Sequence, residues 1–263
     1  MSRRLLLGLA LAGAALPASA QSGEGLARDL ANPLSTLTRV PLELDWDRKV
    51  GPNRDGDRFT VRALPTLPVD LNRDWNLISR TDARFVAQSD VAPGAGHQFG
   101  FGDVTQHFLF APKRPTAGGL LWGAGPALLL PTGTDGRLSS RKYGLGPTGA
   151  VVFQDGGVTY GVEAHHLWSV AGDDARGDVS VTRLRPFAAY TTRDAWTFGV
   201  DADSTYDWKS KQGSTPVTLS ASKLATIAGR PVNVGGGLRH YVDSADGGPH
   251  GWAFRVSATF AFP

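Results

Sequence analysis

Apolar and polar residues alternate with period two along most of this chain. Between residues 38 and 46 apolar side chains occupy most even positions, ending at Trp46, whereas the odd positions include Glu43 and Asp45. Strict alternation places the two kinds of side chain on opposite faces of a β-strand. The clearest case is residues 252–262, where large apolar residues alternate with small or polar ones. Each such segment is predicted to be a two-faced strand.

Twelve segments show this alternation, which predicts twelve strands. An even number returns the carboxyl terminus to the side where the mature amino terminus begins, as bacterial outer-membrane barrels require. The stronger segments are 38–46, 59–70, 75–85, 120–130, 158–168, 196–203 and 252–262, and the weaker ones are 105–111, 143–154, 179–191, 217–226 and 232–242.

The connections between the segments alternate in length. Long ones fall near 47–57, 88–100, 132–141, 171–178, 209–215 and 243–250, and shorter ones near 72–74, 113–118, 155–157, 192–195 and 228–230. The pattern predicts an all-β fold, a transmembrane antiparallel β-barrel of twelve strands over residues 36–263, with short periplasmic turns and longer extracellular loops. A soluble periplasmic β-protein is the alternative that strand periodicity alone leaves open.

The amino terminus has the pattern of a secretory signal peptide over residues 1–20. A basic start with Arg3 and Arg4 precedes an apolar run and the cleavage site Ala18-Ser19-Ala20. The apolar run is shorter than the ~20 residues that a membrane-spanning helix needs. We therefore expect export to the outer membrane of a Gram-negative bacterium. Residues 21–35 lack alternation and are predicted to lie in the periplasm or to fold into the barrel as a plug.

Composition refines this interpretation without changing it. The chain of 263 residues is 41% hydrophobic with a mean hydropathy of -0.17, and 33 glycines and 17 prolines argue against long helices. There is no cysteine, which excludes disulfides and thiolate metal sites. Removing Arg3 and Arg4 lowers the formal charge from +3 (27 basic, 24 acidic) to +1 (25 basic, 24 acidic). No nucleic-acid partner is implied.

Aromatic residues and prolines have positional meaning in a barrel. All seven tryptophans fall near strand ends or on apolar faces, as expected for girdles in contact with outer-membrane lipid. Phe260 and Phe262 supply the terminal aromatic residues expected of a strand that the outer-membrane assembly machinery handles, although Pro263 follows and departs from that pattern. Prolines inside strands remove ladder hydrogen bonds, so we expect bulges or strand ends at Pro41, Pro65, Pro126, Pro147, Pro186, Pro216 and Pro231.

The glycine-rich motifs occur in an order that is typical of one family. Gly102-Asp103-Val104-Thr105-Gln106 is followed by Trp122-Gly123-Ala124-Gly125-Pro126, Leu130-Pro131-Thr132-Gly133-Thr134, Lys142-Tyr143-Gly144-Leu145-Gly146-Pro147, Pro186-Phe187 and Tyr206-Asp207-Trp208. This order resembles the outer-membrane proteins grouped under the MetA-pathway of phenol degradation, which are often labelled transporters. The resemblance implies a β-barrel that passes hydrophobic or aromatic compounds.

The inner face is the surface on which the sequence places most of the charge. Its side chains could form a paired network that rigidifies a narrow barrel, or could line an aqueous path. Arg183 and Arg185 would form a local basic ladder on one strand. Because alternate positions of a strand face the same side, the charged and histidine side chains opposite the apolar ones are predicted to face inward. These are Arg39, Arg62, Arg80, Arg84, Arg183, Arg185, Arg239 and Arg255, together with Glu43, Asp45, Asp70, Asp82, Asp103, Glu163, Asp201 and Asp203, and also His107 and His165.

Motifs for chemistry are weak. The spacing Gly144-x-Gly146-x-x-Gly149 matches a dinucleotide fingerprint, but it enters a strand rather than a helix, so no cofactor is predicted. Adjacent His165 and His166 point to opposite faces and cannot share a metal, and no zinc spacing occurs. His166 and Ser169 likewise face opposite sides, which disfavours a phospholipase-like pair. The sequence predicts a protein that is not an enzyme.

These observations favour a passive channel or transporter for small-molecule solutes. The runner-up is a structural or adhesive outer-membrane barrel with an occluded lumen, and a lipid-modifying enzyme comes third.

Overall fold

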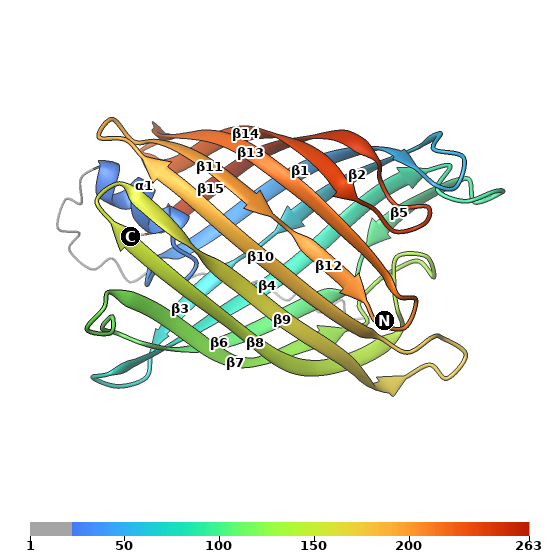
Figure 1. Cartoon of the computed structure of the whole chain (residues 1–263), viewed down its shortest axis with the longest axis horizontal. Helices are drawn as coiled ribbons and strands as arrows, with labels where there is room; N and C mark the ends of the chain where they lie inside the picture. Colours follow the sequence, from blue (N-terminus) through green and yellow to red (C-terminus); the bar gives the residue numbers. More distant parts are fainter. Residues whose placement is uncertain (1–22, 263) are drawn as a thin grey trace, which may run out of the picture.

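The structure, a computed structural model, describes residues 23–262, so the predicted signal peptide lies outside the described residues. One short helix precedes a single antiparallel sheet that closes on itself as a barrel (Figure 1). The elements are α1 (Gly23–Ala31), β1 (Thr38–Val50), β2 (Gly56–Ala63), β3 (Thr66–Asp70), β4 (Trp75–Ser89), β5 (His97–Phe101), β6 (Val104–Pro112), β7 (Leu120–Leu130), β8 (Lys142–Asp155), β9 (Val158–Gly172), β10 (Ser180–Thr191), β11 (Trp196–Ala202), β12 (Ser204–Asp207), β13 (Gln212–Ile227), β14 (Arg230–Asp243) and β15 (Gly251–Phe262).

Fifteen strand segments make twelve barrel strands. β2 and β3 both pair with β1 and β4, β5 and β6 both pair with β4, and β11 and β12 both pair with β10 and β13. Each of these three pairs is therefore one barrel strand with a short interruption, at 64–65, 102–103 and 203. The ladders β1–β15 and β9–β10 complete the ring. The predicted all-β, twelve-stranded antiparallel barrel is confirmed.

Connections sort to the two ends of the barrel, but several differ in length from the prediction, and the loops predicted over 47–57 and 88–100 shorten to 51–55 and 90–96. One end, here the turn end, carries 71–74, 113–119, 156–157, 192–195 and 228–229. The opposite loop end carries 51–55, 90–96, 131–141, 173–179, 208–211 and 244–250. Residues 113–119 are as numerous as those of 90–96, whereas β13 begins at Gln212 and shortens the loop predicted over 209–215. That loop is short because Tyr206 and Gly213 still pair in the β12–β13 ladder.

The two faces of the sheet are inverted relative to a soluble protein. Leu219 is 61% exposed on the outer face, whereas Asp45 and Arg239 are each 6% exposed on the inner face. Soluble proteins rarely expose an apolar surface that continues around the molecule, but lipid requires one. No helix within residues 23–262 is both long and apolar enough to cross a membrane.

Aromatic side chains gather near both rims of the outer face. At the turn end the Trp75 and Trp122 rings meet edge to face at 5.8 Å. At the loop end Trp252 packs on His240 at 4.8 Å, and Trp208 on Tyr206 at 4.9 Å. Rings placed in this way at two levels are typical of the interfacial girdles of membrane barrels.

Prolines are accommodated in two ways. Pro65 lies at the β2–β3 interruption, Pro216 at a register shift in β13 and Pro231 next to the start of β14, as the sequence predicted. Pro41, Pro126, Pro147 and Pro186 instead remain inside strands, where the expectation of a bulge or strand end was wrong. The ladder tolerates Pro126 and Pro147 because they lie directly opposite each other in β7 and β8.

Glycines make this proline pair possible. The β6–β7 ladder is interrupted between His107 and Phe110, and the β8–β9 ladder between Leu145 and Thr148. A Cβ at Gly125 would lie 2.0 Å from the Phe108 carbonyl oxygen, and one at Gly146 would lie within 1.8 Å of the His166 oxygen. The repeated Gly-Pro motif thus forms a crease in the wall that only glycine permits.

We expect Gly125→Ala and Gly146→Ala each to lower the free energy of unfolding by about 1–3 kcal/mol, because the added methyl group meets backbone oxygen that cannot rotate away. Gly149→Ala is the matched control, since its Cβ would meet nothing nearer than 3.6 Å. Urea unfolding of the refolded protein, followed by heat-modifiable gel mobility, measures the difference. Equal midpoints for all three variants would show that the crease does not require glycine.

Candidate functional site in the barrel lumen

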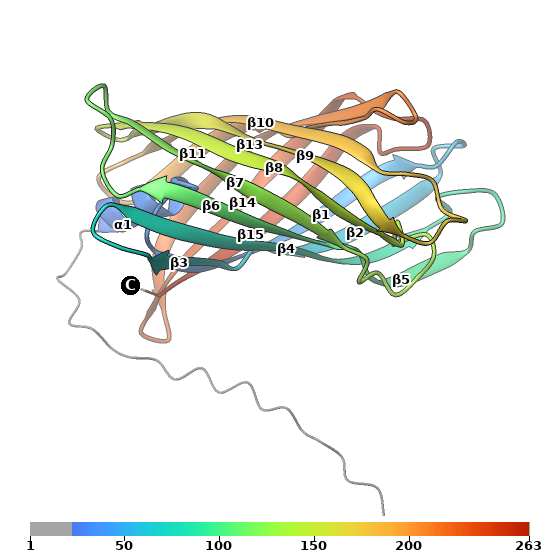
Figure 2. The same ribbon diagram turned by 90° about the horizontal axis from the view of Figure 1, so that it is seen from below.

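The amino-terminal segment lies inside the turn end of the barrel. Figure 2 shows α1 within the ring of strands at that end. Leu34 packs with inward-facing residues such as Ile78, Leu109 and Val152, and Leu26 packs with Leu37 and Ala261. The inner wall at this end therefore has an apolar part, and the segment buries it.

Lumen-facing side chains hold this segment by its backbone. Arg39 donates from Nη1 to the carbonyl oxygens of Asn32 at 2.8 Å and Asp29 at 3.3 Å. Arg80 donates from Nη2 to the Pro33 oxygen at 2.8 Å. Asn32 Nδ2 in turn donates to Gln154 Oε1 on β8 at 2.9 Å. The segment is anchored by hydrogen bonds to neutral groups, together with its leucine contacts.

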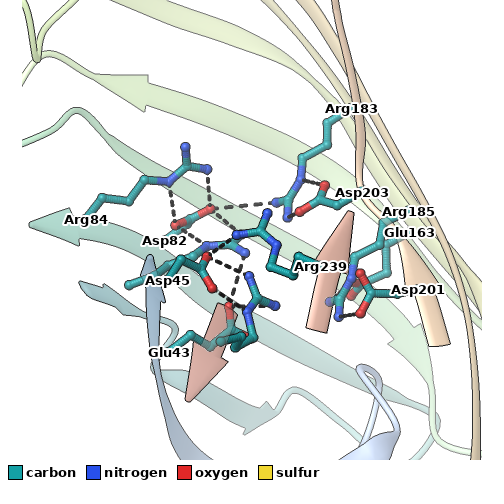
Figure 3. Close-up of polar contacts among 12 residues, drawn as sticks. Glu43, Asp45, Asp82, Arg84, Glu163, Arg183, Arg185, Asp201, Asp203 and Arg239 are labelled. Atoms are coloured by element: carbon teal, nitrogen blue, oxygen red, sulfur yellow. Dashed lines mark hydrogen bonds and ion pairs between the residues drawn. The ribbon is translucent and has the colours of Figure 1, made fainter. Parts of the chain in front are cut away.

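A layer of ion pairs occupies the middle of the lumen, with Asp82 at its centre (Figure 3). Arg62 makes a bidentate contact with Asp82, with N–O distances of 2.8 and 2.6 Å. Arg84 approaches the same carboxylate at 3.1 and 3.3 Å, and Arg183 at 3.7 Å. Because the Asp82 side chain is only 3% exposed, three guanidiniums share one buried carboxylate.

A second centre lies beside it on the opposite side of Arg62. Arg255 binds Asp45 bidentately at 2.6 and 2.8 Å, and Arg239 reaches the same carboxylate at 2.7 Å. Glu43 lies 3.3 Å from Arg255 and 3.6 Å from Arg62. Arg62 therefore connects the two centres into one network.

Some of these pairs span the lumen. Arg80 on β4 lies 2.5 Å from Glu163 on β9, and β6, β7 and β8 separate these strands around the ring. Arg183 on β10 likewise reaches Asp82 on β4. Side chains that join distant strands must cross the interior, so these contacts close the lumen rather than coat its wall. Other pairs join neighbouring strands. Arg183 binds Asp203 at 2.5 Å, next to β12. Arg185 lies 3.3 Å from Asp201 on β11 and 3.4 Å from Glu163 on β9.

A cavity of about 270 Å³ lies between α1 and the ion-pair layer. Apolar groups, including Leu30, Leu109 and Phe187, line one part of it, and guanidiniums and carboxylates line another. Such a mixed lining resembles small-molecule sites, in which a few polar groups orient a ligand against apolar walls.

His107 and His165 meet in this cavity. Their rings lie 4.9 Å apart, and His107 Nδ1 is 3.2 Å from Thr148 Oγ1. Within residues 23–262 no group of three histidine or carboxylate side chains is arranged to hold a metal ion. The arrangement suits hydrogen bonding to a solute.

Most of the predicted inward residues belong to these clusters, but two do not. Asp103 accepts hydrogen bonds from Gly133 N, Ser139 Oγ and Ser140 N and Oγ, and so anchors the 131–141 loop. Asp70 pairs with Lys113 at the turn end, at 2.7 Å. Both carboxylates sit near the ends of strands, where the neighbours are connections rather than facing walls. The residues that join the ion-pair network or α1 are Arg39, Glu43, Asp45, Arg62, Arg80, Arg84, Asp82, Glu163, Arg183, Arg185, Asp201, Asp203, Arg239 and Arg255.

Sequence reasoning missed a further inward carboxylate. Asp47 is 5% exposed, accepts a hydrogen bond from the Tyr241 hydroxyl at 2.8 Å and lies 3.5 Å from Arg239. The signal was present, because odd positions of β1 continue to face inward past Trp46. Extending the alternation beyond the last apolar residue would have found it.

His166 faces outward, with partners that the sequence did not reveal. Its Nδ1 lies 2.7 Å from Thr182 Oγ1, and Ser180 Oγ is 3.4 Å from its Nε2, both across the β9–β10 ladder. Trp208 Nε1 donates to the same Thr182 oxygen at 2.8 Å. The Thr182 hydroxyl can donate to Nδ1 or accept from it, because it has two lone pairs and one proton, so the tautomer of His166 sets the direction of both contacts.

These features define a twelve-stranded membrane barrel whose lumen is closed by an internal segment and by ion pairs. Among solved structures, the chain is similar to the COG4313 outer membrane channel from Pseudomonas putida F1, at 15% identity and a TM-score of 0.64, covering 86% of this chain and 96% of that one. The β domain of the Bordetella autotransporter BrkA matches at 12% identity over 86% and 100% of the two chains, with a TM-score of 0.45. No family model and no curated protein matches the chain. The likeness to the Pseudomonas putida channel shows that this chain has the fold of an outer-membrane channel. It agrees with the resemblance of the glycine-rich motifs in fold, but it does not show the family.

We expect Asp82→Asn to lower the free energy of unfolding by about 3–5 kcal/mol, because it leaves Arg62, Arg84 and Arg183 facing one another in a buried layer. The amide keeps the shape of the side chain, so the effect reports charge. Asp178→Asn is the control, since that carboxylate pairs with Lys142 and Lys209 in an exposed loop and its loss should change little. Heat-modifiable gel mobility against temperature checks both variants. A match between Asp82→Asn and the wild type would mean that the network does not stabilise the barrel.

Proposed function

We propose that this protein is an outer-membrane channel for the passive passage of small molecules. The observation that carries the proposal is the cavity of about 270 Å³ between α1 and the ion pairs. A barrel with a purely structural role has no need of an interior space with a mixed polar and apolar lining. The likeness to a channel of the same fold supports the proposal.

Passage requires that the internal segment move, and its attachment allows this. In this proposal the described part of the segment predicted as a plug, residues 23–35, acts as that plug. Arg39 and Arg80 hold the segment by hydrogen bonds to carbonyl oxygens that are worth about 1.5–3 kcal/mol each, and the neutral Asn32–Gln154 bond is worth about 0.5–1.5 kcal/mol. Water that enters the lumen can replace these hydrogen bonds. The remaining contacts include hydrogen bonds of Arg28 with Gly156 and Gln154 and the packing of a few leucines.

The family resemblance suggests hydrophobic or aromatic solutes, and the apolar part of the cavity agrees with them. In this proposal residues 1–20 direct export, and the assembly machinery inserts the barrel by recognising β15, which ends in Phe260 and Phe262. Outer-membrane lipid then surrounds the girdles. The proposal assigns the protein no enzymatic role, since among the described residues no carboxylate is recorded as a hydrogen-bond partner of the outward His166 to orient it as a base.

A structural barrel with an occluded lumen is the second candidate. The cross-lumen pairs Arg80–Glu163 and Arg183–Asp82 favour it, since they close the interior as it stands. Conduction measurements separate the two functions.

Deleting residues 23–35 is expected to raise single-channel conductance in planar bilayers several-fold, because the apolar half of the lumen would then fill with water. The wild type should show a small conductance with rare larger openings. Heat-modifiable mobility confirms that the shortened barrel is folded. A folded barrel that conducts in neither form, at any salt concentration, would be structural and not a channel.

Neutralising the arginine ladder tests whether these residues face the path. With Arg183→Gln and Arg185→Gln together, Asp82, Glu163, Asp201 and Asp203 lose counter-charges, so the reversal potential in a KCl gradient should shift toward that of potassium. Arg48→Gln is the control, because Arg48 is exposed and lies over the Trp46 ring on the outer face. An unchanged reversal potential in the double variant would place both arginines outside the conducting path.

A further inference from the structure

The charges that line the cavity do not balance. Five arginines, Arg39, Arg62, Arg80, Arg183 and Arg185, line it, against the four carboxylates of Glu43, Asp82, Glu163 and Asp201. The charged partners outside the lining balance one another, since they are Arg84, Arg239 and Arg255 and the carboxylates of Asp45, Asp47 and Asp203, so one guanidinium is in excess. Burial of an unbalanced charge is costly unless other groups solvate it.

The pairing pattern identifies which arginine is in excess. All four carboxylates lie within ion-pair distance of at least one arginine, through Arg62, Arg80, Arg183, Arg185 and Arg255. Arg39 forms no ion pair with any residue of the range 23–262. It is only 5% exposed, and its hydrogen bonds go to the backbone oxygens of Asn32 and Asp29. A buried guanidinium with neutral acceptors thus lines the cavity.

The remaining wall of the cavity suits an apolar body. Leu30 and Ala31 from the internal segment, Leu109 from β6 and Phe187 from β10 line it. A volume of about 270 Å³ lies just below the range of about 300–1,000 Å³ that holds drug-sized ligands. The space therefore suits a single ring with a small substituent.

We propose that this cavity binds an organic monoanion, with its carboxylate on Arg39 and its apolar body against Leu30, Leu109 and Phe187. The inference rests on the proposed channel function and names a solute class for it. A monoanion balances the excess guanidinium, whereas a cation would add to it and a neutral ring would leave it unchanged.

Binding at Arg39 would also loosen the plug. A carboxylate is charged and can take two parallel N–H···O bonds from one guanidinium, whereas a carbonyl oxygen is neutral and cannot form the bidentate contact. A solute carboxylate therefore competes with the Asn32 and Asp29 carbonyl oxygens for the same guanidinium. The solute that fits the cavity is thus the one that releases the segment blocking it.

Benzoate and benzamide test the proposal, because they share one ring and nearly one shape but differ in charge. The full-length mature protein is examined in planar bilayers at pH 7 and constant ionic strength. Benzoate should raise the open probability and benzamide should not. Titration calorimetry of the refolded protein should show binding of benzoate only. Equal effects of the two compounds, or no binding and no opening with benzoate, would overturn the proposal.

Variants of Arg39 assign the site. Arg39→Gln should open more often without solute, because the segment loses an anchor, and should need roughly tenfold more benzoate for half-binding, the loss of a hydrogen bond to a charged group. Arg39→Lys keeps the charge without the fork and should bind with intermediate strength. Arg230→Gln, an exposed arginine at the same end of the barrel, is the matched control and should bind benzoate like the wild type.

The outcomes separate this inference from the channel proposal. Wild-type benzoate affinity in a folded Arg39→Gln variant would place the anion elsewhere and overturn the inference. If Arg39→Gln does not fold, Arg39→Lys and the comparison of benzoate with benzamide decide. A further outcome is that the chain without residues 23–35 conducts while the wild type neither binds benzoate nor opens with it. That outcome would support the channel proposal and overturn only the anion site.

Discussion

The closure of the sheet is the constraint on which the rest of this structure depends. Hydrocarbon offers no partner to a backbone N–H or C=O group, so each must be paired within the protein, and a sheet can achieve this only as a ring. The β1–β15 and β9–β10 ladders complete that ring. A ring of twelve strands is narrow, and long side chains from distant strands meet inside it. Arg183 on β10 and Asp82 on β4 make contact for this reason.

The lumen is layered because its two kinds of inner surface need different partners. Near the turn end the inward residues include Ile78, Leu109 and Val152, which the internal segment covers with Leu34. In the middle they are charged, and charges withdrawn from water are tolerated only in pairs. Neither layer can fill the space where they meet, so a cavity remains there with one apolar and one charged part. The site therefore follows from how a narrow barrel buries its own interior.

The wall itself is irregular where the prolines meet. Pro126 and Pro147 lie side by side in β7 and β8 and remove hydrogen bonds from the ladders with β6 and β9. Gly125 and Gly146 admit the facing carbonyl oxygens at distances that no side chain would allow. The cost of lost hydrogen bonds is thereby confined to one crease, and the ring stays closed on both sides of it.

Period-two alternation by itself determined the twelve strands, the apolar outer face and nearly all of the inward charges, because the side to which a strand residue points is a local property of the backbone. Only the tertiary structure decided which charges meet. The partners of Asp82 come from three barrel strands, and the register that aligns Ser180 and Thr182 with His166 is a property of the β9–β10 ladder. Parity also placed Asp103 inward without showing that its carboxylate anchors a loop. The position of α1 was open as well, since a segment without alternation finds its place through the apolar surface and the guanidiniums that the closed ring presents to it.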